Sequence, residues 1–248
     1  MIPLKDENPT RRTAVVTLAL IAINVVVYFG VQPNPQDLAG STDFTYRNAA
    51  IPCEVVTGEP LSDVELATHT CNQQPEGPAH FPGKSVYLAV LISMFLHGSL
   101  LHLGGNMLFL WIFGNNAEDR LGRVGYLAFY LAGGLVATLA HIFVQPDSTI
   151  PMVGASGAIA AVMGAYLVWF PNVRIRTMFL FFIIPFFRDI RAKWLLLIWF
   201  LTQFLEPFNP NSGVAWMAHV GGFAFGIAFG ALVSGIGRAR RPALRGPY

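Results

Sequence analysis

The stretch that decides the fold is Val153-Gly154-Ala155-Ser156-Gly157-Ala158, which opens an almost wholly apolar run from Ile159 to Phe170. A serine at this point lies at the start of a helix, where free backbone N–H groups point outward and the helix dipole favours developing negative charge. The flanking glycines allow another backbone to come close. A plainer interpretation is that these small residues only pack membrane helices together, and the stretch alone favours it.

The composition places the chain among membrane proteins. It is 54% hydrophobic and 12% charged, and its apolar runs are long enough to cross a bilayer. The net charge of +2 gives no reason to expect nucleic acid as a partner. The first apolar run, residues 14–31, is too long for the core of a cleavable signal and lacks a convincing cleavage site. We therefore predict a polytopic integral membrane protein.

Six apolar segments predict an all-α protein with six membrane crossings. These segments are residues 14–31, 100–113, 126–144, 156–170, 194–205 and 214–236. The predicted organisation is a polar lead (1–13), a membrane domain (14–236) that contains a long hydrophilic outer loop (32–84), and a basic tail (237–248). The apolar stretch 179–187 is broken by Pro185 and is predicted to be an interfacial loop, because another crossing would move the tail to the opposite side.

The basic residues orient these crossings. Of the 16 lysines and arginines, all but Arg47 and Lys84 fall on the side of the membrane that holds the N-terminus. Basic residues concentrate on the cytoplasmic side of membrane proteins. Both termini are therefore predicted to be cytoplasmic.

Four polar side chains are predicted to meet in the outer third of the membrane. Ser156 heads the fourth segment, and His219 lies about 8 Å into the sixth. His102 and Asn106 are four residues apart, so they share one face of the second segment. Polar groups at that depth are functional candidates by default. The alternative is that they only hydrogen-bond the helices together.

These residues resemble the rhomboid family of intramembrane serine proteases. The resemblance covers roughly residues 96–230 in the family's order and rests on His97-x4-His102-x3-Asn106, Glu118-Asp119-Arg120, Gly154-Ala155-Ser156-Gly157 and Ala218-His219-x2-Gly222-x3-Gly226. It implies a six-helix rhomboid-like bundle of the bacterial type, and hence a multi-pass protein of a bacterial plasma membrane.

The resemblance also implies roles for single residues. Ser156 would be the nucleophile, His219 the general base, and Asn106 and His102 the side-chain donors to the oxyanion. His97, Gly154 and Gly222 would support the site, and Glu118 with Arg120 would brace a loop. One departure is Ala160, because the family often has an aromatic residue four positions after the serine.

The chemistry can also be argued from the residues. A serine hydroxyl needs a base to become a good nucleophile. No acidic residue lies in the apolar part of any predicted crossing, so a Ser156–His219 dyad is the simplest arrangement. The oxyanion needs donors, which Asn106, His102 and the backbone N–H groups of Ser156 and Gly157 would supply.

The expected substrates are single-span membrane proteins, cut within the bilayer near the outer face. We expect no cofactor and no metal, and we make no prediction of the oligomeric state. Two other functions stay open. One is a catalytically inactive rhomboid-like protein that binds membrane helices, and the other is a histidine-lined transporter.

The only two cysteines, Cys53 and Cys71, both fall in the outer loop. Disulfides persist on the extracytoplasmic side, so we predict that these cysteines pair. A zinc site with His69 and His80 is the alternative.

Overall fold

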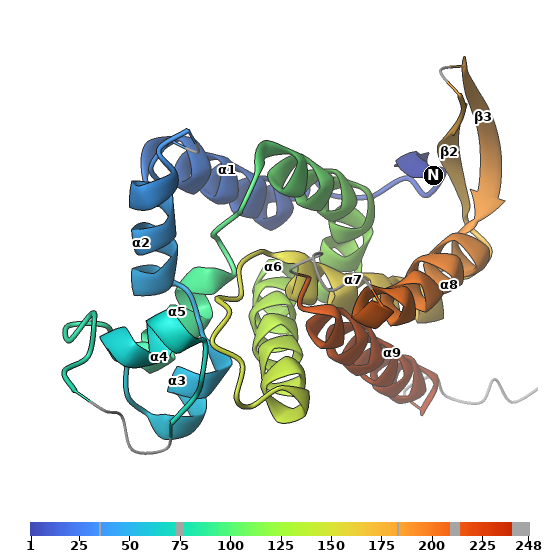
Figure 1. The fold of residues 1–248 in the computed structure, drawn as a ribbon. Coiled ribbons are helices and arrows are strands. Elements are labelled where there is room, and N and C mark those ends of the chain that lie inside the picture. Colours follow the sequence, from blue (N-terminus) through green and yellow to red (C-terminus); the bar gives the residue numbers. More distant parts are fainter. Residues whose placement is uncertain (35, 73–76, 183, 209–213, 240–248) are drawn as a thin grey trace, which may run out of the picture.

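The computed structural model describes residues 1–34, 36–72, 77–182, 184–208 and 214–239. Helices form the body of the molecule, and a small sheet lies at one edge (Figure 1). The elements are, in chain order, β1 (Ile2–Asp6), α1 (Val15–Gly30), α2 (Leu38–Asn48), α3 (Pro52–Thr57), α4 (Asp63–Thr68), α5 (Val86–Ser93), α6 (Leu100–Val144), α7 (Ser156–Trp169), β2 (Arg174–Phe181), β3 (Ile184–Arg191), α8 (Ala192–Thr202), the 3-10 helix η1 (Gln203–Phe208) and α9 (Trp216–Ala239).

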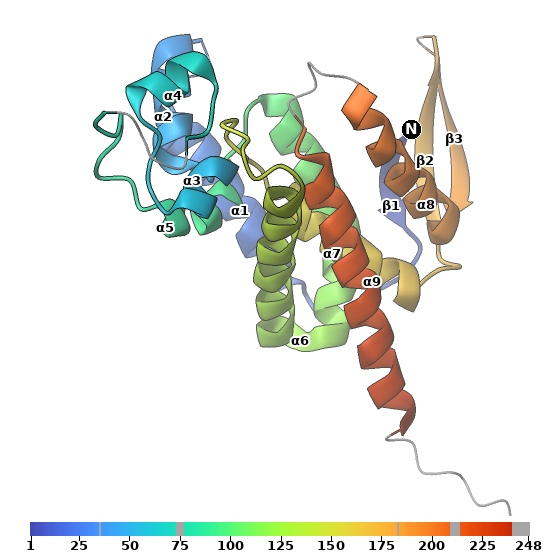
Figure 2. The same ribbon diagram turned by 60° about the horizontal axis from the view of Figure 1, so that its bottom comes forward.

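Helix α7 forms the centre of the bundle. It packs against both α6 and α9 (Figure 2). Every residue from 157 to 166 is buried. A helix that is apolar on all sides belongs in a core, and the small side chains of this one let its neighbours come close. Ser156, the first residue of α7, is thereby fixed relative to both neighbouring helices.

Helix α6 contains two of the predicted crossings. The sequence predicts a charged turn between residues 113 and 126, but the helix continues through most of this region and is interrupted at Gly122, where φ is 73° and ψ is 166°. A positive φ of this kind strongly favours glycine, which has no Cβ to clash with the backbone. Gly122 therefore separates the two arms of α6.

The mainly helical fold is as predicted, but the six crossings are not confirmed. Among the described residues, two helical segments are long and apolar enough to cross a membrane, Arg123–Val144 and Trp216–Gly235. This criterion considers length and composition only. Val15–Gly30 and Ser156–Trp169 are apolar but shorter. The 14 residues of α7 rise about 21 Å, which is less than the roughly 30 Å hydrocarbon core of a typical bilayer.

The prediction of an all-α protein is wrong in one region. Strands β1, β2 and β3 form an antiparallel sheet in that order. The predicted polar lead supplies β1, and the predicted interfacial loop 179–187 belongs to the β2–β3 hairpin. The reason is visible in the first half of β2, where Ile175 and Thr177 are buried while Arg174 and Arg176 are exposed. This alternation is the period of a strand.

Strand β1 is fastened to the helical bundle by a buried carboxylate. Asn116 Nδ2 of α6 donates to Asp6 Oδ2 over 2.6 Å, and the Tyr166 hydroxyl of α7 donates to the same oxygen over 2.8 Å. At the other end of the chain, residues 237–239 of the predicted basic tail complete α9, and residues 240–248 lie outside the described part.

The long hydrophilic segment, residues 32–84, is called the outer insert below, and it contains α2, α3 and α4 (Figure 1). Cys53 and Cys71 form a disulfide, with their Cα atoms 5.8 Å apart, so neither is available to bind zinc.

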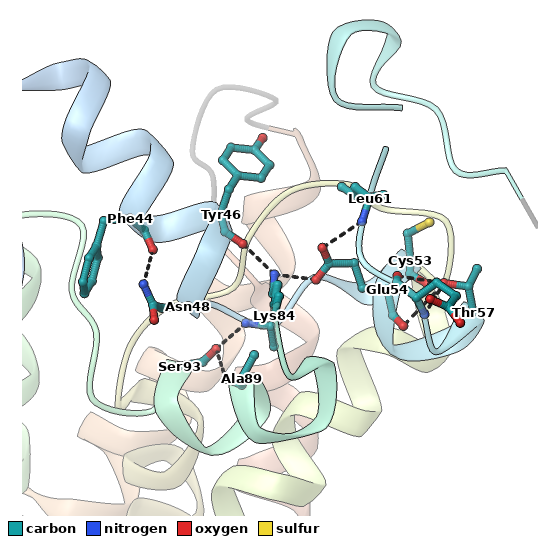
Figure 3. A network of polar contacts seen from close by, with 12 residues as sticks. Phe44, Tyr46, Asn48, Cys53, Glu54, Thr57, Leu61, Lys84, Ala89 and Ser93 are labelled. Atoms are coloured by element: carbon teal, nitrogen blue, oxygen red, sulfur yellow. Dashed lines mark hydrogen bonds and ion pairs between the residues drawn. The ribbon is translucent and has the colours of Figure 1, made fainter. Parts of the chain in front are cut away.

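A buried ion pair lies at the base of the outer insert (Figure 3). The Lys84 ammonium pairs with Glu54 and also donates to the Tyr46 carbonyl over 2.6 Å. Burial raises the pKa of Glu54 and lowers the pKa of Lys84, because desolvation disfavours each charge, while the pairing opposes both shifts. Lys84 is therefore part of the interior of the insert, not a free surface cation.

The outer insert also contacts the loop that leads to Ser156, residues 145–155, which is called the serine loop below. The Met152 N–H donates to the Ala50 carbonyl over 2.8 Å, and the Cys53 N–H donates to the Ser148 carbonyl over 3.0 Å. Ser93 of α5 accepts from the Ala50 N–H through its hydroxyl and from the Gly154 N–H through its carbonyl. The insert and α5 thus fix the path of the serine loop.

Candidate active site

The serine loop turns sharply at Gly154, just before α7 begins. The φ of Gly154 is +123°, a conformation that side chains other than glycine rarely adopt. A Cβ on Gly154 would also lie 2.8 Å from the His102 ring. Glycine therefore serves two needs here, a sharp turn and a close approach of the loop to α6. This places Ser156 beside His102 and Asn106.

His219 of α9 reaches Ser156 because α7 and α9 are in backbone contact. A Cβ on Gly222 would lie 2.3 Å from the Gly157 carbonyl oxygen, and one on Gly226 would lie 1.9 Å from the Ala161 carbonyl oxygen. At this close approach, His219 Nε2 lies 2.8 Å from Ser156 Oγ, within hydrogen-bond distance. A serine hydroxyl and a candidate base are therefore already in contact.

Asn106 and His97 form a buried pair next to these groups. Asn106 Nδ2 lies 2.9 Å from His97 Nε2, and the His97 and His102 rings meet edge to face at 5.0 Å. An amide nitrogen can only donate, so the His97 ring nitrogen accepts this bond. The second amide hydrogen of Asn106 is not used by His97 and is available to a group in the neighbouring cleft.

A cleft of about 590 Å³ brings the predicted residues together. Ser156, His219, His102 and Asn106 all line it, together with Trp199 of α8. Gly157 does not line it. Instead, the Cα of Gly157 faces Ala137 and Ala218 in the packed interior, so Gly157 could contribute to the cleft only through its backbone. His97 is buried behind Asn106.

Glu118 and Arg120 do not form a pair with each other, nor do they line the cleft. Glu118 accepts from the Val16 and Thr17 N–H groups over 2.9 and 2.8 Å, so it caps the start of α1. The Arg120 guanidinium lies over the Trp169 ring at 4.9 Å, at the end of α7. The predicted loop brace is thus a brace between helix ends, because both side chains reach neighbouring helices.

Two glutamines and one aromatic residue belong to the site but were not predicted from the sequence. Gln32 holds the backbone of His97 through two hydrogen bonds of 2.9 Å, one to its carbonyl and one from its N–H. Gln203 contacts His219 Nδ1 over 2.6 Å. The Trp199 ring lies 5.8 Å from the His219 ring and supplies an aromatic neighbour that Ala160 cannot. The sequence offered one signal for the two glutamines, because each lies at the end of a predicted apolar segment.

The described part of the site holds no arrangement suited to a metal. Within the described residues, no group of three or more histidine, cysteine, aspartate or glutamate side chains could bind one. The contacts instead offer a hydroxyl, an imidazole that can take its proton, and amide or imidazole donors that line the same cleft. This set of groups suits acyl transfer.

Comparison with known proteins gives a consistent family. A family model described as the Rhomboid domain matches residues 84–236. The presenilin-associated rhomboid-like protein, mitochondrial, of Bos taurus is 36% identical over 145 residues, which are 56% of this chain and 36% of the relative. Rhomboid protein 1, mitochondrial, of Saccharomyces cerevisiae is 27% identical over 159 residues, 59% of this chain and 42% of the relative.

A third relative comes from a plant. RHOMBOID-like protein 12, mitochondrial, of Arabidopsis thaliana is 30% identical over 158 residues, which are 57% of this chain and 45% of the relative. The matched part covers less than half of each of these relatives. The prediction of a bacterial plasma-membrane protein with cytoplasmic termini is wrong on this comparison, because all three relatives are named as mitochondrial.

Proposed function

Because this chain belongs to the rhomboid family, we propose that it is a serine endopeptidase that cleaves membrane-spanning segments of other proteins within the bilayer. The observation that carries the proposal is the 2.8 Å contact between His219 Nε2 and Ser156 Oγ. The contact lies in a cleft that also exposes the donors of Asn106 and His102. A binding protein would need no such contact between a hydroxyl and a base.

The proposed reaction uses a dyad. Ser156 Oγ attacks the peptide carbonyl carbon while its proton passes to His219 Nε2, which makes histidine the general base. The negative charge on the carbonyl oxygen is stabilised by Asn106, His102 and backbone N–H groups of Ser156 and Gly157. His219 then gives the proton to the leaving amine. A water molecule, activated by the same histidine, hydrolyses the acyl-enzyme and restores Ser156.

The proposed setting is a membrane crossed six times, by α1, the two arms of α6, α7, α8 and α9. The names of the relatives support a mitochondrial membrane as the location. The proposed substrates are single-span membrane proteins whose spanning helix unwinds locally, so that a peptide bond can reach Ser156 in the cleft.

The test is covalent labelling with a serine-reactive fluorophosphonate in a reconstituted bilayer, together with cleavage of a single-span reporter protein. The parent chain is expected to label and to cleave. Ser156→Ala should do neither, and His219→Ala should lose both because the hydroxyl is no longer activated. An intact, folded parent chain that neither labels nor cleaves would contradict the proposal and favour a role in binding alone.

A further inference from the structure

The side chain of Gln203 is buried against the base of the proposed dyad. Gln203 is the first residue of η1, directly after α8, and it is 7% exposed. Its Oε1 lies 2.6 Å from His219 Nδ1, the ring nitrogen that faces away from Ser156. Ser156, His219 and Gln203 therefore form one continuous chain of polar contacts, with Gln203 at its far end.

The contacts of Gln203 Nε2 determine the orientation of the side-chain amide, that is, which end carries the oxygen. Its Nε2 donates to the Trp199 carbonyl over 2.9 Å and to the Thr202 hydroxyl over 3.2 Å. The Thr202 hydroxyl itself donates to the same Trp199 carbonyl over 2.6 Å. A carbonyl can only accept. A reversed amide would put its oxygen against the Trp199 carbonyl oxygen, so the oxygen must face His219.

This orientation determines the protonation of the His219 ring. Because Gln203 Oε1 can only accept, His219 Nδ1 must carry the hydrogen. In a neutral imidazole the other nitrogen, Nε2, then has a free lone pair. That lone pair faces Ser156 Oγ at 2.8 Å and can accept the hydroxyl proton. The opposite tautomer would place an N–H against the serine and could not act as its base.

We propose that Gln203 is the positioning residue of the site and holds His219 in the tautomer that activates Ser156. The inference rests on the proposed function and extends it from a dyad to an array of three side chains. Gln203 does not touch the substrate, and it acts only through His219. As a neutral amide, it orients the ring and still accepts from Nδ1–H when His219 is protonated, without adding a buried charge.

The packing of α8 on α9 keeps this acceptor in place. The Phe200 and Phe223 rings stack with centroids 4.8 Å apart, and the Trp199 ring lies 5.8 Å from the His219 ring. Trp199 and Gln203 both contact the His219 ring, and they come from one continuous segment, α8 with η1. Both contacts of the His219 ring therefore depend on how α8 and η1 pack on α9.

The first variant to test is Gln203→Met, which keeps the volume of the side chain and removes its acceptor. The rate of fluorophosphonate labelling and the kcat for a single-span reporter should both fall by roughly 10- to 100-fold, the usual worth of a hydrogen bond to a charged group. KM and the unfolding temperature should change little. Gln36→Met is the matched control, because it makes the same change at an exposed position of the outer insert, outside the cleft.

The second variant is Gln203→Glu, which keeps an acceptor at the same position. It should recover labelling relative to Gln203→Met, and the acid limb of its pH–rate profile should move to higher pH, because a carboxylate favours the charged imidazolium. A merely structural role would not move this limb. Parental rates in Gln203→Met, or equal loss in both variants, would overturn the inference. Absence of labelling in the parent chain would instead overturn the proposed function.

Discussion

The Asn106 side chain is placed to act on charge that develops in the cleft. His97 takes one of its two amide hydrogens, which leaves the other for an oxyanion. If the proposed function holds, Asn106→Ala should lower kcat by about 10²–10³ while the fold survives, since removing one such donor has that effect in serine proteases. Fluorophosphonate labelling should slow without vanishing, because Ser156 and His219 are still in contact.

Two further variants make this test specific. Asn24→Ala is the matched control, because Asn24 is a buried asparagine that donates to the Leu20 carbonyl of its own helix. It should label at the parental rate. His102→Ala should resemble Asn106→Ala, and the double variant should lose less than the sum of the two, because both donors would serve one oxygen. Parental labelling in both single variants would rule out the oxyanion assignment.

At this scale, the sequence predicts some of the site and not the rest. Ser156, His219, His102 and Asn106 are visible in it because polar groups in apolar segments are few and their depths can be counted. Gln203 is not visible in the same way. Its distance to His219 depends on how α8 ends in a 3-10 turn and how it packs on α9, and neither follows from spacing along the chain. Gln32 is hidden for the same reason.

Contact between helix backbones is the feature that holds α7 and α9 together. A methyl group on Gly226 would lie 1.9 Å from the Ala161 carbonyl oxygen, so Gly226→Ala should force the helices apart. We expect a loss of about 1–3 kcal/mol in the free energy of unfolding, as for other overpacked interiors. Labelling of Ser156 should fall as well, because the same approach brings His219 to the serine.

Gly235→Ala on the same helix is the matched control. A methyl group on Gly235 would meet no atom of the described residues within 4 Å, so the substitution should be neutral or should stabilise α9 by up to about 1 kcal/mol through its helix propensity. Both variants can be compared by thermal unfolding in detergent. Equal stability of the two would show that the close approach of α7 and α9 is not what holds the bundle.

The outer insert contains an acid-sensitive helix start at α4. Although burial raises the pKa of Glu65, hydrogen bonds from the Ser62 and Asn72 N–H groups and the Ser62 hydroxyl lower it overall. Because the pKa of Glu65 is lower in the folded chain than its ordinary value of 4.5, the ionised carboxylate stabilises the insert at pH values above 4.5. This stabilisation is lost as the pH falls through the folded-state pKa.

Hydrogen exchange of residues 62–72, corrected for the intrinsic pH dependence of exchange, should therefore show protection that falls on acidification from below about pH 4.5. Glu65→Gln should remove this dependence, because it has no charge to lose. Glu59→Gln, at an exposed position in the same insert, should leave it unchanged. Protection that stays constant down to about pH 2 in the parent chain would contradict this interpretation of Glu65.

The β2–β3 hairpin shows why element type was harder to predict than the site. The alternation of Arg174, Ile175, Arg176 and Thr177 has the period of a strand, but it leads into the apolar run from residue 179 to 187. Composition within that run does not distinguish an interfacial loop from a strand. The hairpin pairs with β1, which is far from it in the sequence, as the pairing of Ile2 with Met178 shows. Short-range pattern could not reveal it.

The molecule as a whole has two ends with different chemistry. The outer insert is closed by the Cys53–Cys71 disulfide and lies beside the serine loop, whereas β1, the Glu118 cap and the Arg120–Trp169 contact lie around the opposite helix ends. The proposed six crossings require such a division, because they place the insert and β1 on opposite faces of the membrane.

The proposed six crossings can be tested with single cysteines in sealed vesicles, because the two native cysteines form a disulfide and do not react with thiol reagents. Arg174 and Arg191 are paired residues at the base of the hairpin, so Arg174→Cys and Arg191→Cys should react with an impermeant reagent from one and the same face. Asp43→Cys, at an exposed position in α2 of the outer insert, should react from the opposite face. In the six-crossing arrangement, four crossings separate the N-terminus from the hairpin, and one crossing separates the N-terminus from the insert. The hairpin and the insert must therefore lie on opposite faces of the membrane. Reaction of all three cysteines from one face would disprove the six-crossing arrangement and, with it, the matched depth of Ser156 and His219.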